Sequence, residues 1–208
     1  MNQSLTHLPE EASESPCAKV VLIGVSTGGL KALCAILPAL PADFPWPVLI
    51  VQHQHPDADD YLAQLLNEQC QIKIKQSDEK ERIRPGTGYL APANYHLLLE
   101  EDLTLSLSLD PPVNFSRPAV DVLFESAVDA MGQNCIGIIL TGANKDGAKG
   151  LAEINHAGGT TVVQNPAQAV ATAMPLAAMA LITPDHILNL QEIGSWLVEH
   201  AKTHKEEI

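Results

Sequence analysis

The chain has 208 residues, of which 46% are hydrophobic and 18% charged, so it can bury a substantial core and wholesale disorder is excluded. Its 25 acidic and 12 basic residues give a formal net charge of −13, which disfavours binding to nucleic acid or to an anionic lipid surface. No apolar run reaches the roughly 20 residues that a membrane-spanning helix needs, and the N-terminus lacks the pattern of a secretory signal.

The chain contains four well-separated cysteines: Cys17, Cys34, Cys70 and Cys135. This usage is typical of reduced thiols in a cytoplasmic protein and argues against a structural zinc or a disulfide framework. Residues 1–17 and 204–208 are predicted to be tails, the first because it is polar and lacks apolar periodicity. Residues 18–203 are predicted to form one domain.

Within this domain, short apolar runs rich in Val and Ile alternate with segments of helical periodicity. The runs predict strands buried on both faces, whereas Leu and Ile recurring at helical spacing predict helices. The first predicted elements are a strand at 19–25, a helix at 28–40, a strand at 47–53, a helix at 57–70, a half-exposed strand at 71–75, a turn at 84–88 and an antiparallel hairpin at 96–109. The later ones are a helix at 120–131, a strand at 135–142, a helix at 146–159, a strand at 160–164, a short helix at 175–180, a short strand at 181–183 and a helix at 187–203.

This alternation predicts the α/β class: a doubly wound, mostly parallel sheet with helices on both faces and a small antiparallel hairpin. In open parallel sheets, functional groups gather in the crevice outside the carboxyl ends of the strands. Three loops at predicted strand ends carry reactive side chains: residues 24–29, 52–57 and 141–147.

The first loop, GVSTGG, places Ser26 between a buried strand and a helix. A serine on such a sharp turn points its hydroxyl out of the sheet edge, where N–H groups of the first helical turn can stabilise an oxyanion. The spacing fits neither the G-x-G-x-x-G dinucleotide motif nor a P-loop, which needs Lys-Ser or Lys-Thr after the glycines. A plain helix N-cap is the alternative role for Ser26.

The second loop, QHQHPD, places His53 at the carboxyl end of the next strand, from where it could accept a proton from Ser26. The pattern H-x-H-x-D also opens some binuclear metal sites, but those continue with a histidine where this chain has Ala58. His96 and His156 could supply further ligands, although neither lies in a second metal motif.

The third loop, TGANKDG, contains Asp146, which could cap the following helix or orient the imidazole of His53. Ser, His and Asp therefore fall at three predicted strand ends of one parallel sheet. Because geometry rather than chain order defines a catalytic triad, this arrangement predicts a serine hydrolase.

The sequence also resembles a known family, the chemotaxis protein-glutamate methylesterases, over about residues 19–185. The resemblance runs through several motifs in order: VVLIGVSTGGLKAL, IVQHQHP, RPGTGYLAPANYHL, SRPAVDVLFESA, LTGANKDGAKG and QNPAQAVATAMP. It implies Ser26 as nucleophile, His53 as general base and acid, and Asp146 as the residue that orients the imidazole. The backbone N–H groups of Thr27 and Ala143 are then expected to hold the oxyanion.

The resemblance implies hydrolysis of glutamyl methyl esters on the cytoplasmic helices of chemoreceptors, through an acyl-enzyme and without a metal or organic cofactor. Deamidation of receptor glutamines is a further reaction of the family. The expected partners are chemoreceptors, with a methyltransferase or a separate receiver protein as further candidates. Two other interpretations stay open: a serine hydrolase of the same fold with another ester or amide substrate, and a receptor-docking module without turnover.

Three features depart from the family. Many members carry an N-terminal receiver domain, which 17 residues cannot form, so we do not expect control by phosphorylation of this chain. Residues 143–145, Ala-Asn-Lys, stand before Asp146 where the family often has Gly-Met-Gly, and one extra residue separates His53 from Pro56.

Two further expectations concern basic residues that could contact the substrate. A cluster of five could dock a Glu-rich receptor helix or form an ordinary solvated face: Lys73, Lys75, Lys80, Arg82 and Arg84. Arg117 is expected near the site, where it could steer a carboxylate-rich substrate.

Overall fold

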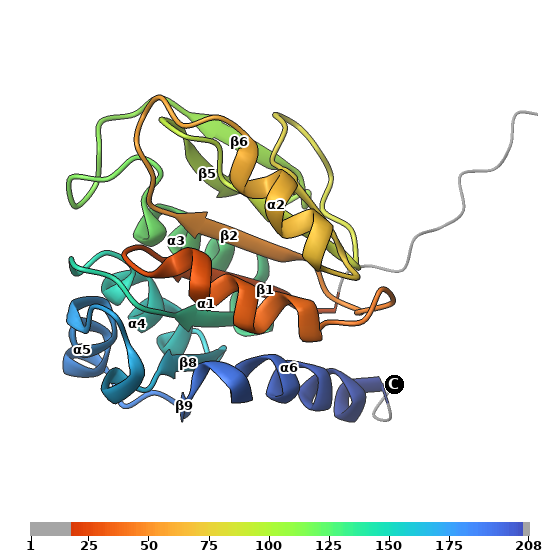
Figure 1. Cartoon of the computed structure of the whole chain (residues 1–208), viewed down its shortest axis with the longest axis vertical. Coiled ribbons are helices and arrows are strands. Elements are labelled where there is room, and N and C mark those ends of the chain that lie inside the picture. Colours follow the sequence, from red (N-terminus) through yellow and green to blue (C-terminus); the bar gives the residue numbers. More distant parts are fainter. Residues whose placement is uncertain (1–17, 206–208) are drawn as a thin grey trace, which may run out of the picture.

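The computed structural model describes residues 18–205, which form a seven-stranded parallel sheet between two helical layers (Figure 1). The strand order is β3-β4-β2-β1-β7-β8-β9. The strands are β1 Val20–Val25, β2 Val48–Gln52, β3 Lys73–Gln76, β4 Thr87–Leu90, β7 Cys135–Ile139, β8 Thr160–Gln164 and β9 His186–Leu188. A separate antiparallel hairpin consists of β5 His96–Leu99 and β6 Leu105–Ser108.

The described region also contains six α-helices and three short 3-10 helices. The α-helices are α1 Gly29–Ile36, α2 Tyr61–Gln69, α3 Val120–Met131, α4 Ala148–His156, α5 Ala173–Leu181 and α6 Leu190–Lys205; the 3-10 helices are Leu37–Ala39, Gly132–Asn134 and Pro166–Gln168. Helices α1, α2 and α6 cover the face toward the viewer in Figure 1, and we call them the front layer. The back layer consists of α3, α4, α5 and the β5–β6 hairpin.

The central strand β1 shows why its sequence is apolar without alternation. Val21 and Ile23 pack into the core under the front layer, whereas Val20 and Leu22 pack into the core under the back layer. All four side chains are 0% exposed. Successive side chains of a strand point to opposite faces, so a strand covered on both sides needs an apolar residue at every position.

The predicted fold class is confirmed, including the parallel sheet, the helices on both faces and the small hairpin. The strand predicted at 181–183 is wrong, because the Ala-rich run before it continues as helix α5 to Leu181 and the last strand forms later, at His186–Leu188. The turn predicted at 84–88 also overlaps β4, which pairs with β2 and β3.

The predicted tail at 1–17 and residues 206–208 of the predicted tail at 204–208 lie outside the described residues, whereas residues 204 and 205 belong to α6, which extends to Lys205. Among the helices that are described, none is both long enough and apolar enough to span a bilayer.

Candidate active site

The carboxyl ends of β1, β2 and β7 meet at one edge of the sheet, because β1 lies between the other two strands. Their loops are hydrogen-bonded to one another. The N–H of Ser26 donates to the carbonyl oxygen of Thr141 at 2.9 Å, and the N–H of His53 donates to that of Val25 at 3.0 Å. The three loops singled out in the sequence are therefore neighbours, as the strand-end rule requires.

Two of the three predicted triad side chains are in direct contact. His53 Nε2 lies 2.7 Å from Asp146 Oδ2, and the His53 side chain is only 11% exposed. Asn144 Nδ2 lies 3.5 Å from the other ring nitrogen, Nδ1. A carboxylate facing Nε2 and an amide N–H facing Nδ1 favour the neutral tautomer with its proton on Nε2 and a lone pair on Nδ1.

The Asp146 carboxylate is completely buried and accepts hydrogen bonds on both oxygens. Besides His53, its donors are the N–H groups of Val120 at 2.6 Å and Asp121 at 3.2 Å and the Asn114 side chain at 2.9 Å. Burial by itself raises the pKa of Asp146, but the hydrogen bonds from His53, Val120 and Asn114 outweigh it and hold the pKa below its ordinary value. The carboxylate therefore stays ionised beside the imidazole.

The third predicted residue, Ser26, lines a cavity of about 680 Å³ together with His53. Within residues 18–205 its side chain forms no hydrogen bond with the His53 ring. The helix-capping alternatives for Ser26 and Asp146 are not found, because the N-caps of α1 and α4 are Gly28 and Gly147 and neither helix has a side-chain cap. Both side chains are thus left for other roles.

The backbone N–H groups of Thr27 and Ala143 belong to the two loops beside Ser26. A Cβ built on Gly142 would lie 3.0 Å from the Cβ of Ser26, which shows how closely the Ala143 loop approaches the serine. Across the part of the chain that is described, neither N–H donates a hydrogen bond to another group. Two donors are therefore available beside Ser26 for an oxygen that gains negative charge.

The sequence interpretation missed Gln52, whose side chain links the backbones of the Ser26 and His53 loops. Its side chain is 8% exposed, and its Nε2 donates to the carbonyl oxygens of Ser26 at 3.2 Å and His53 at 2.6 Å. A glutamine ending an otherwise apolar strand was the one available signal, because a polar side chain buried in a core needs a partner.

It also missed a second buried carboxylate behind Asp146. Asp121, 3% exposed, accepts from the N–H of Gly150 at 2.9 Å and from Asn114 Nδ2 at 2.8 Å. Asn114 therefore bridges two acids, since the same amide nitrogen also donates to Asp146. Burial raises the pKa of Asp121, and the charge of Asp146 contributes in the same direction.

The histidines of the metal alternative do not converge. Among residues 18–205, no group of three or more His, Cys, Asp or Glu side chains is placed to hold a metal ion. His96 is a buried structural residue whose Nε2 contacts the carbonyl oxygen of Pro111 and whose Nδ1 accepts from the N–H of Ala119. His55 is a loop residue with 77% of its side chain exposed.

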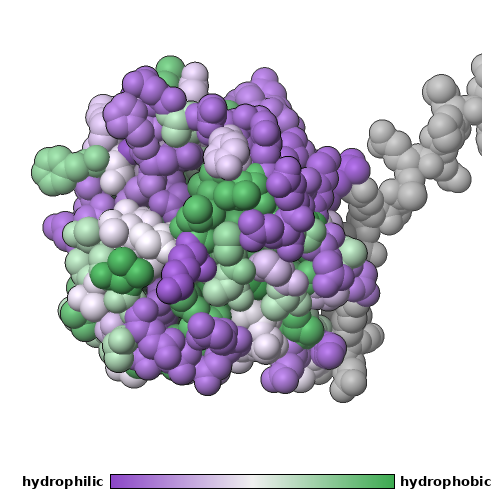
Figure 2. Space-filling view, viewed as in Figure 1, coloured by the Kyte–Doolittle hydropathy of each residue, from purple (hydrophilic) through white to green (hydrophobic). Residues whose placement is uncertain are grey.

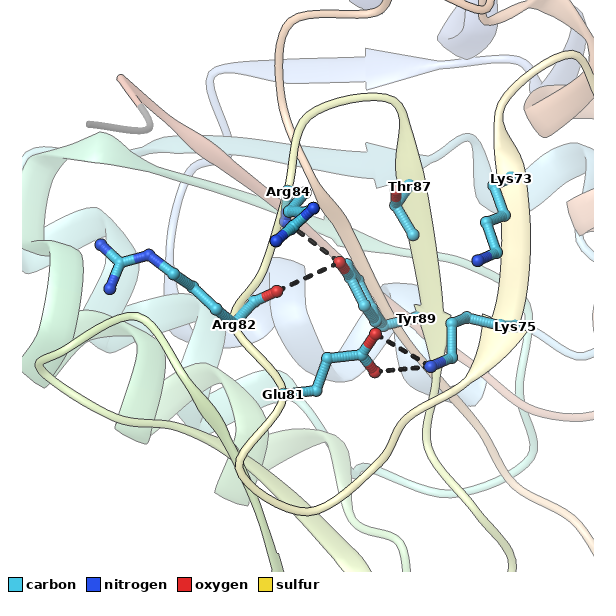
Figure 3. Close-up of a pocket in the computed structure, with 7 residues that line it drawn as sticks. All are labelled: Lys73, Lys75, Glu81, Arg82, Arg84, Thr87 and Tyr89. Carbon is cyan, nitrogen blue, oxygen red and sulfur yellow. Dashed lines mark hydrogen bonds and ion pairs between the residues drawn. The ribbon is translucent and has the colours of Figure 1, made fainter. Parts of the chain in front are cut away.

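Four members of the basic cluster line a cavity of about 230 Å³ beside β3 and β4 (Figure 3). Lys75 donates to the carboxylates of Asp78 and Glu81 at 2.7 and 2.8 Å, which offsets part of the cluster's charge. This pairing favours an ordinary solvated face. The Arg117 guanidinium is used within the chain, since it donates to Asn94 Oδ1 and to the carbonyl oxygen of Leu109 at 2.7 Å each.

Comparison with known proteins gives consistent matches over most of the chain. Residues 21–197 match the family model described as CheB methylesterase. The chain is 44% identical over 189 residues to a putative protein-glutamate methylesterase/protein-glutamine glutaminase of Leptospira interrogans, covering 91% of this chain and 98% of that protein. It is 42% identical over 193 residues to protein-glutamate methylesterase/protein-glutamine glutaminase 3 of Burkholderia lata, where it spans 53% of the relative. The crystal structure of the Thermotoga maritima CheB methylesterase catalytic domain superposes with a TM-score of 0.85 at 33% identity, covering 88% of this chain and 98% of that one.

Proposed function

The chain belongs to the CheB methylesterase family, and from this premise we propose that it hydrolyses glutamyl methyl esters on chemoreceptors through a Ser26–His53–Asp146 triad. The observation that carries the proposal is the buried His53–Asp146 pair, 2.7 Å apart, in the wall of the cavity that Ser26 also lines. A histidine oriented by a buried carboxylate beside an uncapped serine is the arrangement that activates a hydroxyl for attack on an acyl carbon.

In the proposed first step, Ser26 Oγ attacks the ester carbonyl carbon while His53 Nδ1 accepts the hydroxyl proton. A rotation of the Ser26 side chain brings the two groups together once a substrate fills the cavity, since hydrogen bonds of this kind are often long before substrate binds. The Nε2–H of His53 stays bonded to Asp146, whose ionised carboxylate stabilises the imidazolium that forms.

The tetrahedral intermediate carries its negative charge on the former carbonyl oxygen. We assign the N–H groups of Thr27 and Ala143 to this oxygen, because both are unengaged and lie on the loops beside Ser26.

Collapse of the intermediate breaks the C–O bond to the methoxy group, which takes the proton from His53 and leaves as methanol. A water activated by His53 then hydrolyses the acyl-enzyme and releases the glutamate side chain. A glutamine amide would follow the same path and release ammonia.

The test uses purified protein and two substrates, a receptor cytoplasmic fragment carrying ³H-methyl esters and a small ester such as p-nitrophenyl acetate. We expect methanol release from the receptor, and we expect Ser26→Ala and His53→Ala each to lower kcat by about a thousandfold or more with little change in stability. A fluorophosphonate probe should label the wild type and not Ser26→Ala.

The outcomes separate the competing interpretations. Labelling with small-ester turnover but no methanol release from any methylated receptor fragment would leave a serine hydrolase with another substrate. A folded protein that neither labels nor turns over either ester would be a docking module. Near-normal methanol release by His53→Ala would show that the general base has been wrongly assigned.

A further inference from the structure

The loop between β6 and α3, residues 109–119, contains a tight two-residue turn. Val113 and Ser116 exchange backbone hydrogen bonds of 3.1 and 2.9 Å, and the two residues between them have positive φ angles, 50° at Asn114 and 64° at Phe115. This is the pattern of a type I′ hairpin turn, in which glycine is preferred at the position that Phe115 occupies. In Figure 1 the loop projects at the edge of the molecule where β2 ends and α1 begins.

The turn is held against the candidate active site at several points. Asn114 donates to the Asp146 carboxylate, and Ser116 Oγ lies 3.4 Å from the amide nitrogen of Asn144, the residue beside the His53 ring. At the base of the loop, the Arg117 guanidinium ties the carbonyl oxygen of Leu109 to Asn94. The tip of the turn is therefore fixed relative to the His53–Asp146 pair.

Phe115, at this tip, is as exposed as a side chain can be, with a relative exposure of 104%. The other two phenylalanines of the chain, Phe44 and Phe124, are 1% and 0% exposed and belong to the core. Phe115 is a bulky residue in a backbone conformation that is unfavourable for bulky side chains, and its whole ring is exposed to water. Neither feature stabilises the domain alone, and such positions point to a function for the exposed ring.

Apolar side chains also border the Ser26 cavity. Leu30, at the start of α1, is 45% exposed and lines the Ser26 cavity together with Leu62 of α2. Figure 2 shows apolar side chains gathered over the region of α1 and α2 within a largely hydrophilic surface. Leu30 belongs to α1 of the front layer, whereas Phe115 lies on the loop that leads into α3 of the back layer.

We propose that Phe115 is a docking contact for the protein substrate, packing on an apolar side chain that the substrate presents beside the reacting glutamyl ester. This inference rests on the proposed function, because it takes the substrate to be a protein surface rather than a small ester. A surface whose reacting side chains become glutamates is acidic, and the enzyme carries a net charge of −13, so their net charges repel each other. Apolar contacts can then supply affinity that the net charges do not, and an aromatic ring provides much contact area at low entropic cost.

The experiment compares the wild type, Phe115→Ala and Phe115→Gly on the ³H-methylated receptor fragment and on p-nitrophenyl acetate. We expect both variants to raise KM for the receptor and so lower its kcat/KM by about tenfold. The kcat/KM for the small ester should stay within about twofold of the wild-type value. Phe115→Gly should also melt about 2–4 °C higher than the wild type, because glycine adopts the positive φ freely. The matched control is Ile187→Ala, which removes an apolar side chain of 47% exposure on edge strand β9. This variant should leave kcat/KM unchanged for both substrates.

Each other result has a distinct meaning. Receptor turnover within twofold of wild type in both Phe115 variants overturns the docking contact while leaving the proposed function intact. Equal losses on the receptor and on the small ester also overturn it, because the turn would then act on catalytic geometry. A wild type that hydrolyses only the small ester refutes the proposed substrate, and the docking contact with it.

Discussion

At the scale of single residues, the side chain of Asn114 lies between two buried carboxylates of the site. Its amide nitrogen carries two N–H groups, and each donates to a different buried carboxylate, at 2.8 Å to Asp121 and at 2.9 Å to Asp146. Two acids that are 3% and 0% exposed would repel each other strongly without a donor between them. Asn114 is therefore a positioning residue, which acts on the reaction through Asp146.

We expect Asn114→Gly to lower kcat for p-nitrophenyl acetate about tenfold while KM stays within twofold. Glycine keeps the positive φ of the turn, so the loss comes from the missing amide rather than from backbone strain. The free energy of unfolding should fall by about 1–3 kcal/mol, because both carboxylates lose a charged hydrogen bond. Steady-state kinetics and urea denaturation measure the two effects.

Asn165→Gly is the matched control. Asn165 also uses its side chain in a loop, donating to Asn189 and accepting from the N–H of Ala167, but it contacts neither carboxylate. It should lose stability without losing kcat. If the two variants lose kcat to the same extent, or if Asn114→Gly loses none, the positioning role is wrong.

At the scale of elements, the start of α3 explains why Asp146 remains ionised although it is buried. The N–H groups of Val120 and Asp121 belong to the first turn of this helix and point at the carboxylate. The unpaired N–H groups and the positive end of the helix dipole both favour a negative charge there. Asp146 thus belongs in sequence to the loop before α4, but α3 supplies both of its backbone donors.

Asp146→Asn should lower the free energy of unfolding at pH 7 by about 1–3 kcal/mol, because it removes the charge that these N–H groups stabilise. The folded protein holds the pKa of Asp146 below its ordinary value of 3.8. Between the two pKa values the unfolded chain binds more protons, so this part of the stability increases with pH. It is complete above about pH 5 and is lost as the pH falls through the folded pKa. Urea denaturation across this range should show the gap between wild type and variant narrowing only on the acid side.

The same helix provides the control for this measurement. Asp129 is exposed and lies near the carboxyl end of α3, where a negative charge is unfavourable. Neutralising it in Asp129→Asn should leave stability unchanged or slightly higher. A wild-type advantage over Asp146→Asn that persists undiminished below the folded pKa would contradict the account of Asp146.

Which elements could be predicted depended on how local their causes are. Strand β8 and helix α3 were predicted at the bounds that the structure shows, because buried runs and helical periodicity are properties of the segment itself. Strand β4 was missed because Thr-Gly-Tyr-Leu follows a Pro-Gly turn and becomes a strand through pairing with β2 and β3. Strand β9 has three residues and no buried side chain, so its sequence carries no signal.

The site divides in the same way. Ser26, His53 and Asp146 could be singled out because each lies at the end of a recognisable strand, where parallel sheets gather reactive groups. Asn114 and Gln52 could not be assigned, because their roles depend on which distant atoms they reach. Asn114 contacts a residue 32 positions away, and Gln52 contacts one 26 positions away.

At the scale of the whole molecule, the site lies at one edge of the sheet that separates the two helical layers. Ser26 leads into α1 of the front layer, whereas Asp146 is held by the start of α3 in the back layer. The His53–Asp146 contact therefore joins groups supported by opposite faces of one sheet. Since both cores share the same strands, loss of either layer exposes one apolar face of the sheet and destabilises the strands on which the other layer packs.

This sharing predicts a single cooperative unfolding transition. Leu123, 0% exposed in the back layer, can be replaced by alanine at a cost of about 2–5 kcal/mol. Both tryptophans, Trp46 and Trp196, pack in the front-layer core, so their fluorescence reports on the layer that the substitution does not touch. In Leu123→Ala we expect the urea midpoints from tryptophan fluorescence and from far-ultraviolet circular dichroism to move down together. Loss of p-nitrophenyl acetate hydrolysis should follow the same curve, because the site needs both layers. A fluorescence midpoint that stayed at its wild-type value while the dichroism midpoint fell would show that the layers unfold separately.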